Sequence, residues 1–187
     1  MPEAQAVRVL GTILAGGQAR RFGSDKALAM IDGCAMLDHV ADRLRPQCDA
    51  LMVAGRDWPG LKRIGDRPAP GLGPLGGLAG ALAFAQAYGF DAVLTAGCDL
   101  PGLPRDLRAK LGAPNAILRG QPTIGLWDGS LADPLLHWLQ TAADHSIRAW
   151  GIAAEARWVS ADESIANINT PDDLAAFRPP ADPRSLR

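Results

Sequence analysis

The segment that starts at Leu14 has the composition of a phosphate-binding loop. Residues 14–26 read LAGGQARRFGSDK. Adjacent Gly16 and Gly17 allow a sharp turn that points backbone N–H groups at one place, which suits phosphate oxygens. Three cations follow within seven residues, namely Arg20, Arg21 and Lys26. We therefore expect a site for a polyanion here, although a surface turn with solvated cations is the plainer alternative.

Three acidic residues stand at places where a metal ion or a nucleotide is commonly held. Asp99 directly follows the uncharged run 92–98 and is followed by Pro101. A carboxylate at a strand end suits Mg²⁺, which takes one or two protein carboxylates and completes its shell with phosphate oxygens and water. Asp66 occupies a similar place after residues 61–65, and Asp25 precedes Lys26. A turn residue for Asp99 and a local ion pair for Asp25 remain open alternatives.

A second glycine-rich segment, residues 71–76, formally matches a dinucleotide-binding fingerprint. It reads GLGPLG, and Asp91 follows twenty positions after Gly71. A true fingerprint directly follows the first strand and opens its helix. Pro68 and Pro70 stand before this segment, so no strand leads into it. The pattern therefore favours a helix entry, or a loop against a ligand, over a nicotinamide site.

The alternation of apolar runs predicts the elements that position these residues. Strands are expected at 7–14, 49–54, 61–64, 91–98, 116–118 and 123–127. Helices are expected at 36–44, 75–88, 104–111, 131–139 and from Thr170 onward. Such alternation predicts an α/β fold, a mostly parallel sheet with helices on both faces. Ligands of these folds bind at the carboxyl ends of strands, so the loops after Leu14, Ala54, Ile64 and Cys98 should form the site.

Length and charge narrow the class of protein. The chain has 187 residues with a net charge of -1, which fits one domain over residues 1–177. Residues 178–187, RPPADPRSLR, are expected to form a disordered tail. The balanced charge disfavours a general nucleic-acid binder. No membrane span is expected, because the uncharged run 68–90 is interrupted by Pro and Gly.

The cysteines indicate the compartment. Cys34, Cys48 and Cys98 lie far apart and form no C-x-x-C pair. Three separate cysteines without metal-ligand spacing predict reduced, mostly buried thiols in a cytoplasmic protein.

Five short motifs occur in a fixed order along the chain. The first is residues 14–17, and the second consists of Arg21, Gly23, Asp25 and Lys26 together. The other three are residues 73–77, 98–101 and 167–171. Together they resemble the bacterial molybdenum cofactor guanylyltransferases from about residue 7 to residue 177. The resemblance implies a Rossmann-like nucleotidyltransferase fold. It also implies transfer of GMP from GTP to the phosphate of molybdopterin, with release of pyrophosphate and dependence on Mg²⁺.

The same resemblance implies a role for each matching residue. The nucleotide would be bound by Leu14, Ala15, Gly16, Gly17, Lys26, Asp66 and Asp99. The catalytic groups would be Arg21, Lys26 and Asp99, with Asp99 also holding the metal. Asn167 and Asn169 would lie on the molybdopterin side of the cleft.

The chemistry implied by the resemblance agrees with the residue types present. The attacking phosphate monoester already carries about −1.5 to −2 charges, so no general base is needed. Other readings stay open: a cytidylyltransferase for the same cofactor, a sugar-phosphate nucleotidyltransferase, or a non-catalytic protein that delivers cofactor. The expected partners are GTP and molybdopterin, with transient contact to molybdoenzymes or their chaperones.

Overall fold

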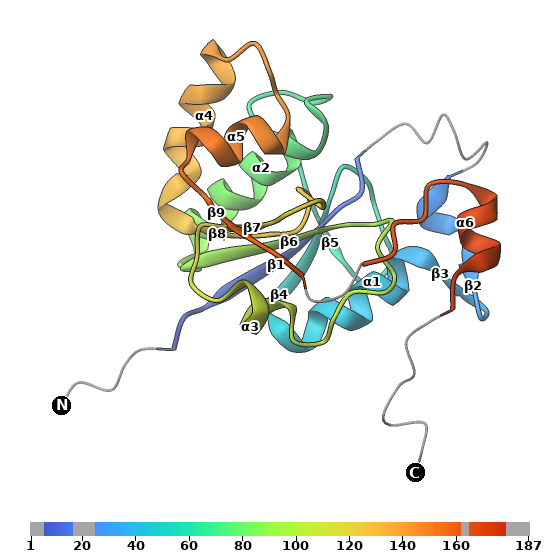
Figure 1. Ribbon diagram of the computed structural model, residues 1–187. Helices are drawn as coiled ribbons and strands as arrows, with labels where there is room; N and C mark the ends of the chain where they lie inside the picture. The colour runs from blue at the N-terminus through green and yellow to red at the C-terminus, as the bar shows by residue number, and fades with distance from the viewer. Residues whose placement is uncertain (1–5, 17–24, 162–164, 179–187) are drawn as a thin grey trace.

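A twisted sheet forms the centre of the computed structural model, which describes residues 6–16, 25–161 and 165–178 (Figure 1). Its strands are β1 (Val9–Leu14), β4 (Ala50–Ala54), β5 (Lys62–Ile64), β6 (Ala92–Gly97), β7 (Ala116–Leu118), β8 (Gly125–Asp128) and β9 (Arg157–Val159). The seven strands have the order β5-β4-β1-β6-β8-β7-β9. A separate small hairpin pairs β2 (Met30–Ile31) with β3 (Cys34–Ala35).

The sheet is parallel around its two central strands, and β8 is the one strand of this sheet that runs in the opposite direction. β1 pairs in parallel with β4 on one side and with β6 on the other. β8 runs antiparallel to both β6 and β7, and β9 is parallel to β7. Every residue of β1 and β6 is buried, which explains why both strands read as continuous apolar runs. The predicted mostly parallel sheet is confirmed.

Helices cover both faces of the sheet, as predicted. The helices are α1 (Met36–Leu44), α2 (Gly73–Tyr88), α3 (Leu107–Leu111), α4 (Ala132–Thr141), α5 (Ile147–Ala153) and α6 (Pro171–Ala176). One hydrophobic cluster joins α2, α4 and α5 to the sheet, and a second joins α1 and α3 to its other face. None of the described helices has the length and apolar character needed to cross a membrane.

The glycine-rich segment enters α2 and allows this helix to lie close to the sheet. Gly71 and Gly73 have φ values of +89° and +63°, so the chain turns into the helix through left-handed conformations. A Cβ on Gly80 would overlap the carbonyl oxygen of Gly65. The segment follows β5 in the chain and does not continue from β1, so the predicted helix entry is confirmed.

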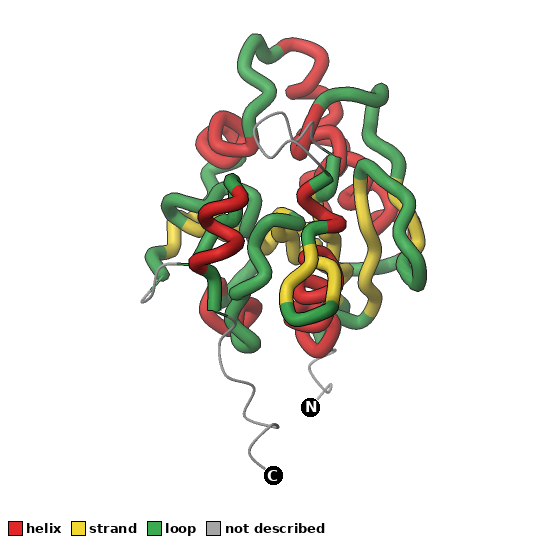
Figure 2. The backbone as a smooth tube through the Cα atoms, turned by 90° about the vertical axis from the view of Figure 1, so that its right-hand side faces the viewer, coloured by secondary structure: helices red, strands yellow, loops and turns green. Residues whose placement is uncertain are grey.

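A third cluster packs α6 against the β2–β3 hairpin. Ile31, Met36 and Ile168 are buried there, with Leu174 and Phe177 partly buried against them. Figures 1 and 2 show α6 beside the hairpin although residues 30–35 and 171–176 lie at opposite ends of the chain. The helix start predicted at Thr170 is confirmed, since its side chain accepts a hydrogen bond from the backbone N–H of Asp173.

Some elements differ from the sequence prediction. The helix expected from Pro104 begins at Leu107, because the side chain of Gln47 accepts a hydrogen bond from Arg108 N–H and donates one to the Pro104 carbonyl. This remote side chain holds residues 104–106 in a turn. α5 and β9 were not predicted, and the expected tail beyond residue 178 lies outside the described residues.

Candidate nucleotide site

A cleft of about 210 Å³ opens at the carboxyl edge of the sheet. Its lining comes from the ends of β1, β4 and β6, the loop before β2, the start of α2 and the loop before β8. The lining residues are Leu14, Ala15, Gly16, Asp25, Lys26, Ala27, Arg56, Pro74, Gly97, Cys98, Asp99 and Thr123. The structure thus brings together the loops after Leu14, Ala54 and Cys98, three of the four that were expected to meet.

Two glycines bring the ends of β1 and β4 into contact at the base of the cleft. Gly55 has a φ of +91°, and a Cβ on it would overlap the backbone of Gly16. The backbone N–H of Ala15 donates to the carbonyl of Ala54 at 2.9 Å. This contact fixes where the first loop leaves the sheet. Gly17, Arg20 and Arg21, which the sequence places in the same loop, lie outside the described residues.

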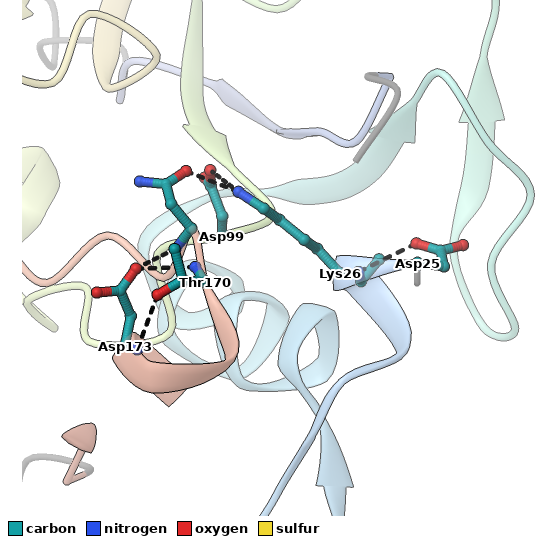
Figure 3. Close-up of polar contacts among 7 residues, drawn as sticks. Asp25, Lys26, Asp99, Thr170 and Asp173 are labelled. Carbon is teal, nitrogen blue, oxygen red and sulfur yellow. Dashed lines mark hydrogen bonds and ion pairs between the residues drawn. The ribbon is translucent and has the colours of Figure 1, made fainter. Parts of the chain in front are cut away.

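Lys26 reaches across the cleft towards Asp99 (Figure 3). It begins the short 3₁₀ turn η1 (Lys26–Leu28). Its Nζ donates a hydrogen bond to Asn169 Oδ1 at 2.7 Å and lies 3.7 Å from Asp99 Oδ2. The side chains of Lys26 and Asp99 are 16% and 25% exposed. The hydrogen bond to Asn169 and the low exposure of Lys26 hold its ammonium group beside the Asp99 carboxylate.

The loop before α6 holds Asn169 in place beside Lys26. Asp173 accepts hydrogen bonds from the backbone N–H groups of Asn169 and Thr170, at 2.9 and 2.8 Å. These bonds lower the pKa of Asp173. The backbone N–H of Ile168 also donates to the carbonyl oxygen of Asp99 at 3.0 Å. The C-terminal segment is therefore tied directly to the strand end that carries Asp99 (Figure 3).

Arg56 is a site residue that the sequence analysis missed. It follows Gly55 at the end of β4, and both of its terminal nitrogens donate to the Asp25 carboxylate. This pair lowers the pKa of Asp25 and raises that of Arg56. The alternative of a local ion pair for Asp25 is not what the structure shows, because its partner Arg56 lies 31 positions away in the chain. The sequence feature that could have identified Arg56 is its place as a cation just past the end of the predicted strand 49–54.

Asp66 and Asn167, two of the predicted site residues, are not among the residues that line the cleft. Asp66 accepts a hydrogen bond from the backbone N–H of Gly71 at 3.3 Å, and it lies beside Gly76 in the first turn of α2. It is absent from the residues that line the cleft. Asn167 has a buried Oδ1 that accepts no hydrogen bond within the described part of the chain.

The thiols differ in exposure more than expected. Cys98 lines the cleft, and burial raises its pKa to about 12, so the thiol is neutral at physiological pH. Burial likewise raises the pKa of Cys48 to about 11. Cys34 is exposed, which differs from the prediction that the thiols are mostly buried, because it lies in the small outer hairpin β2–β3. All three are free cysteines.

The carboxylate of Asp99 is the group in the cleft that fits a hard divalent ion. Across the described ranges there is no group of three or more His, Cys, Asp and Glu side chains close enough to hold a metal. Asp99 is a carboxylate at the end of β6 within a cleft built for a larger ligand. A single carboxylate supplemented by phosphate oxygens and water is a normal Mg²⁺ environment, so the residues present fit this ion.

Comparison with known proteins assigns the family. The MobA-like NTP transferase domain matches residues 11–161. A molybdenum cofactor guanylyltransferase from Rhodobacter capsulatus is 34% identical over 181 residues, covering 90% of this chain and 94% of that protein. The chain belongs to the MobA-like NTP transferase family. As a member of the family, it is a nucleotidyltransferase.

Solved structures share the fold of this MobA-like chain. Molybdopterin-guanine dinucleotide biosynthesis protein A from Archaeoglobus fulgidus superposes with a TM-score of 0.67 at 22% identity, covering 90% of this chain and 95% of that one. A Mycobacterium tuberculosis protein in complex with manganese superposes with a TM-score of 0.63 at 15% identity, covering 90% of this chain and 97% of that one. The predicted α/β nucleotidyltransferase fold is confirmed.

Proposed function

We propose that this site transfers GMP from GTP to the phosphate of molybdopterin and releases pyrophosphate. The near full-length similarity to a molybdenum cofactor guanylyltransferase supports the reaction. The structural observation that carries it is the meeting of Gly16, Lys26 and Asp99 around one cleft. A glycine turn, an ammonium group and a strand-end carboxylate are the groups that a triphosphate with a divalent ion requires.

Charge neutralisation is the main task of the site. Both reactants are polyanions, and the attacking phosphate of molybdopterin carries about −1.5 to −2 charges at neutral pH. In our proposal Lys26 holds the phosphates of GTP, and the backbone N–H of Gly16 donates to them. Gly17 and Arg21 are assigned to the same task from the sequence. Fixed donors directed at the developing negative charge lower the barrier without reorganising during the reaction.

Asp99 would hold Mg²⁺ in this proposal. When bound, the ion would neutralise phosphate charge and polarise the phosphoryl group whose phosphorus is attacked. Lys26 stands 3.7 Å from the same carboxylate, so phosphates that approach Asp99 also approach the ammonium group. The lysine is kept at that position by Asn169, whose amide oxygen accepts its hydrogen bond.

The remaining assignments concern the two substrates and the setting of the enzyme. We assign Leu14 and Ala15, which line the cleft, to the nucleotide, and Asp66 is assigned to it from the motif match alone. We assign Asn167 and Asn169 to molybdopterin, supported by the unpartnered amide oxygen of Asn167. We further propose one domain over residues 1–177. Free cysteines support a cytoplasmic location, with transient contacts to molybdoenzymes or their chaperones.

Pyrophosphate release with each nucleoside triphosphate tests the proposal. The purified protein is incubated with molybdopterin, Mg²⁺ and either GTP, CTP or UTP, and reactions without molybdopterin serve as controls. We expect release with GTP that requires molybdopterin. A preference for CTP would show that the enzyme transfers CMP to molybdopterin in place of GMP. GTP binding without pyrophosphate release would favour a cofactor-delivery protein.

A further inference from the structure

Among the residues that the structure describes, two ion pairs border the cleft, and one of the two involves the groups assigned to the phosphates. Lys26 stands beside Asp99, whereas Arg56 pairs with Asp25. The second pair is partly exposed, with 25% of the Arg56 side chain and 38% of the Asp25 side chain accessible. Both terminal nitrogens of Arg56 are engaged by one carboxylate. The pair is neutral overall, so it adds no net positive charge for a polyanion.

Asp25 controls the backbone from which Lys26 projects. Its Oδ1 accepts a hydrogen bond from the backbone N–H of Ala27 at 3.1 Å, which makes Asp25 the N-cap of η1. Its carbonyl oxygen accepts a second bond from Leu28 N–H at 3.1 Å. Ala27 is 1% exposed and packs in the core beneath the turn. Lys26 therefore has a fixed base, provided that the Asp25 carboxylate keeps its orientation.

Arg56 supplies that orientation. It sits one residue beyond Gly55, whose backbone contacts Gly16 at the base of the cleft. A planar guanidinium that grips both oxygens of a carboxylate fixes the direction of that carboxylate, which a single ammonium group does not. The end of β4 is thus connected through Arg56 and Asp25 to the first turn that carries Lys26.

We propose that Arg56 is a positioning residue, which acts through Asp25 to hold Lys26 in the nucleotide cleft. The assignment of Lys26 to phosphate binding rests on the proposed function, whereas its placement by Arg56 does not. Lys26 is then held at both ends, by the Asp25–Arg56 pair at its backbone and by Asn169 at its ammonium group. The alternative is that Arg56 leaves Asp25 and binds phosphate directly.

A double-mutant cycle separates these roles. GTP affinity is measured for the wild type, Arg56→Gln, Lys26→Ala and the double variant. If Arg56 acts through Lys26, Arg56→Gln weakens binding about tenfold alone and less than twofold when Lys26 is already alanine. Arg56→Lys should restore little, because it cannot grip both oxygens. The proposal would be overturned if Arg56→Gln left GTP affinity unchanged. It would also be overturned if the affinity loss of the double variant equalled the product of the two single losses.

A second measurement tests the placement of Lys26 without any nucleotide. The acetylation rate of Lys26 is compared with that of Lys62 in each protein by mass spectrometry. We expect Arg56→Gln and Asp25→Asn to raise the ratio several-fold, because the ammonium group then leaves its sheltered position. Asp106→Asn, which removes the exposed ion pair with Lys110, is the matched control. An unchanged ratio in both cleft variants would refute the positioning role even if GTP is not the substrate.

Discussion

At the scale of single residues, the described charges of the cleft cancel. Lys26 and Arg56 are cations, and Asp25 and Asp99 are anions. The Lys26–Asp99 distance of 3.7 Å is longer than a hydrogen bond, and the ammonium group instead donates to the neutral amide of Asn169. An ammonium group held by a neutral acceptor retains its charge for a ligand. A divalent ion on Asp99 would then turn the cleft positive.

Replacing Lys26 with alanine should weaken the interaction with GTP by about 1.5–3 kcal/mol, the usual contribution of a charged hydrogen bond. This corresponds to roughly a tenfold to hundredfold loss in rate or affinity. Steady-state pyrophosphate release over a range of GTP concentrations measures it. Unchanged GTP kinetics would remove Lys26 from the site.

Asp99→Asn should abolish Mg²⁺-dependent turnover while the fold is retained. The backbone carbonyl that accepts from Ile168 remains in the variant, so the connection to the C-terminal segment is kept. Turnover is measured over a series of Mg²⁺ concentrations, with circular dichroism to compare folding. Near-normal activity in a folded variant would exclude Asp99 as the metal ligand.

Thiol reagents should distinguish the three cysteines in the native protein. Cys34 is exposed, whereas burial raises the pKa of Cys48 to about 11 and that of Cys98 to about 12. The thiolate is the reactive form, so iodoacetamide at pH 8 should label Cys34 first. Peptide mapping of the alkylated protein gives the order. Labelling of Cys98 as fast as that of Cys34 would show that the Cys98 thiol is not buried and that its pKa is not raised.

At the scale of elements, the cleft depends on one short helix. α6 spans Pro171–Ala176 and buries none of its residues, so its capping contacts carry much of its local stability. Thr170 and Asp173 bond to each other's backbone, and this arrangement fixes Asn169 at the tip of Lys26. A weak helix is therefore coupled to the ammonium group in the cleft.

Thr170→Ala should destabilise α6 by about 1 kcal/mol, the usual effect of removing an N-cap side chain. We expect faster amide hydrogen exchange in residues 168–176 and a higher KM for GTP. Ser146→Ala removes the N-cap of α5, where the hydroxyl accepts from Ala149 N–H, and serves as the matched control. Equal effects of the two substitutions on KM would show that α6 has no special relation to the cleft.

The elements that build the cleft were largely predictable, but the connections between them were not. The helix at 36–44 and the central strands were expected because burial makes their apolar patterns strong. Asp99 and Lys26 were identified because their place at a strand end or in a glycine-rich loop is visible in the sequence. Arg56 was missed because its role depends on Asp25, a contact between distant positions that no local pattern records.

At the scale of the whole molecule, buried thiols make stability depend on alkaline pH. Burial raises the pKa of Cys48 to about 11 and of Cys98 to about 12, from an ordinary value of 9.0. The unfolded chain therefore loses these protons at lower pH than the folded protein does. The stabilising contribution is fully present below pH 9 and is lost as pH rises through the folded values.

Urea unfolding at pH 8 and pH 10 measures this dependence. We expect the free energy of unfolding of the wild type to fall between the two values, and the fall to be smaller in Cys98→Ala. Tyrosine and lysine titrate in the same range, so the difference between the two proteins isolates the thiol. Identical pH dependence in both would contradict the raised pKa of Cys98.

Lys26 and Asn169 are separated by 143 positions in the chain, yet they share one hydrogen bond. Protein synthesis proceeds from the amino end, so β1, β4 and β6, whose ends line the cleft, are made well before the residue that steadies the lysine. A growing polypeptide that has reached residue 161 contains the strand ends of the cleft but lacks the amide that accepts the hydrogen bond of Lys26. The proposed enzyme thus acquires this contact of its nucleotide site only after Asn169 has been synthesised.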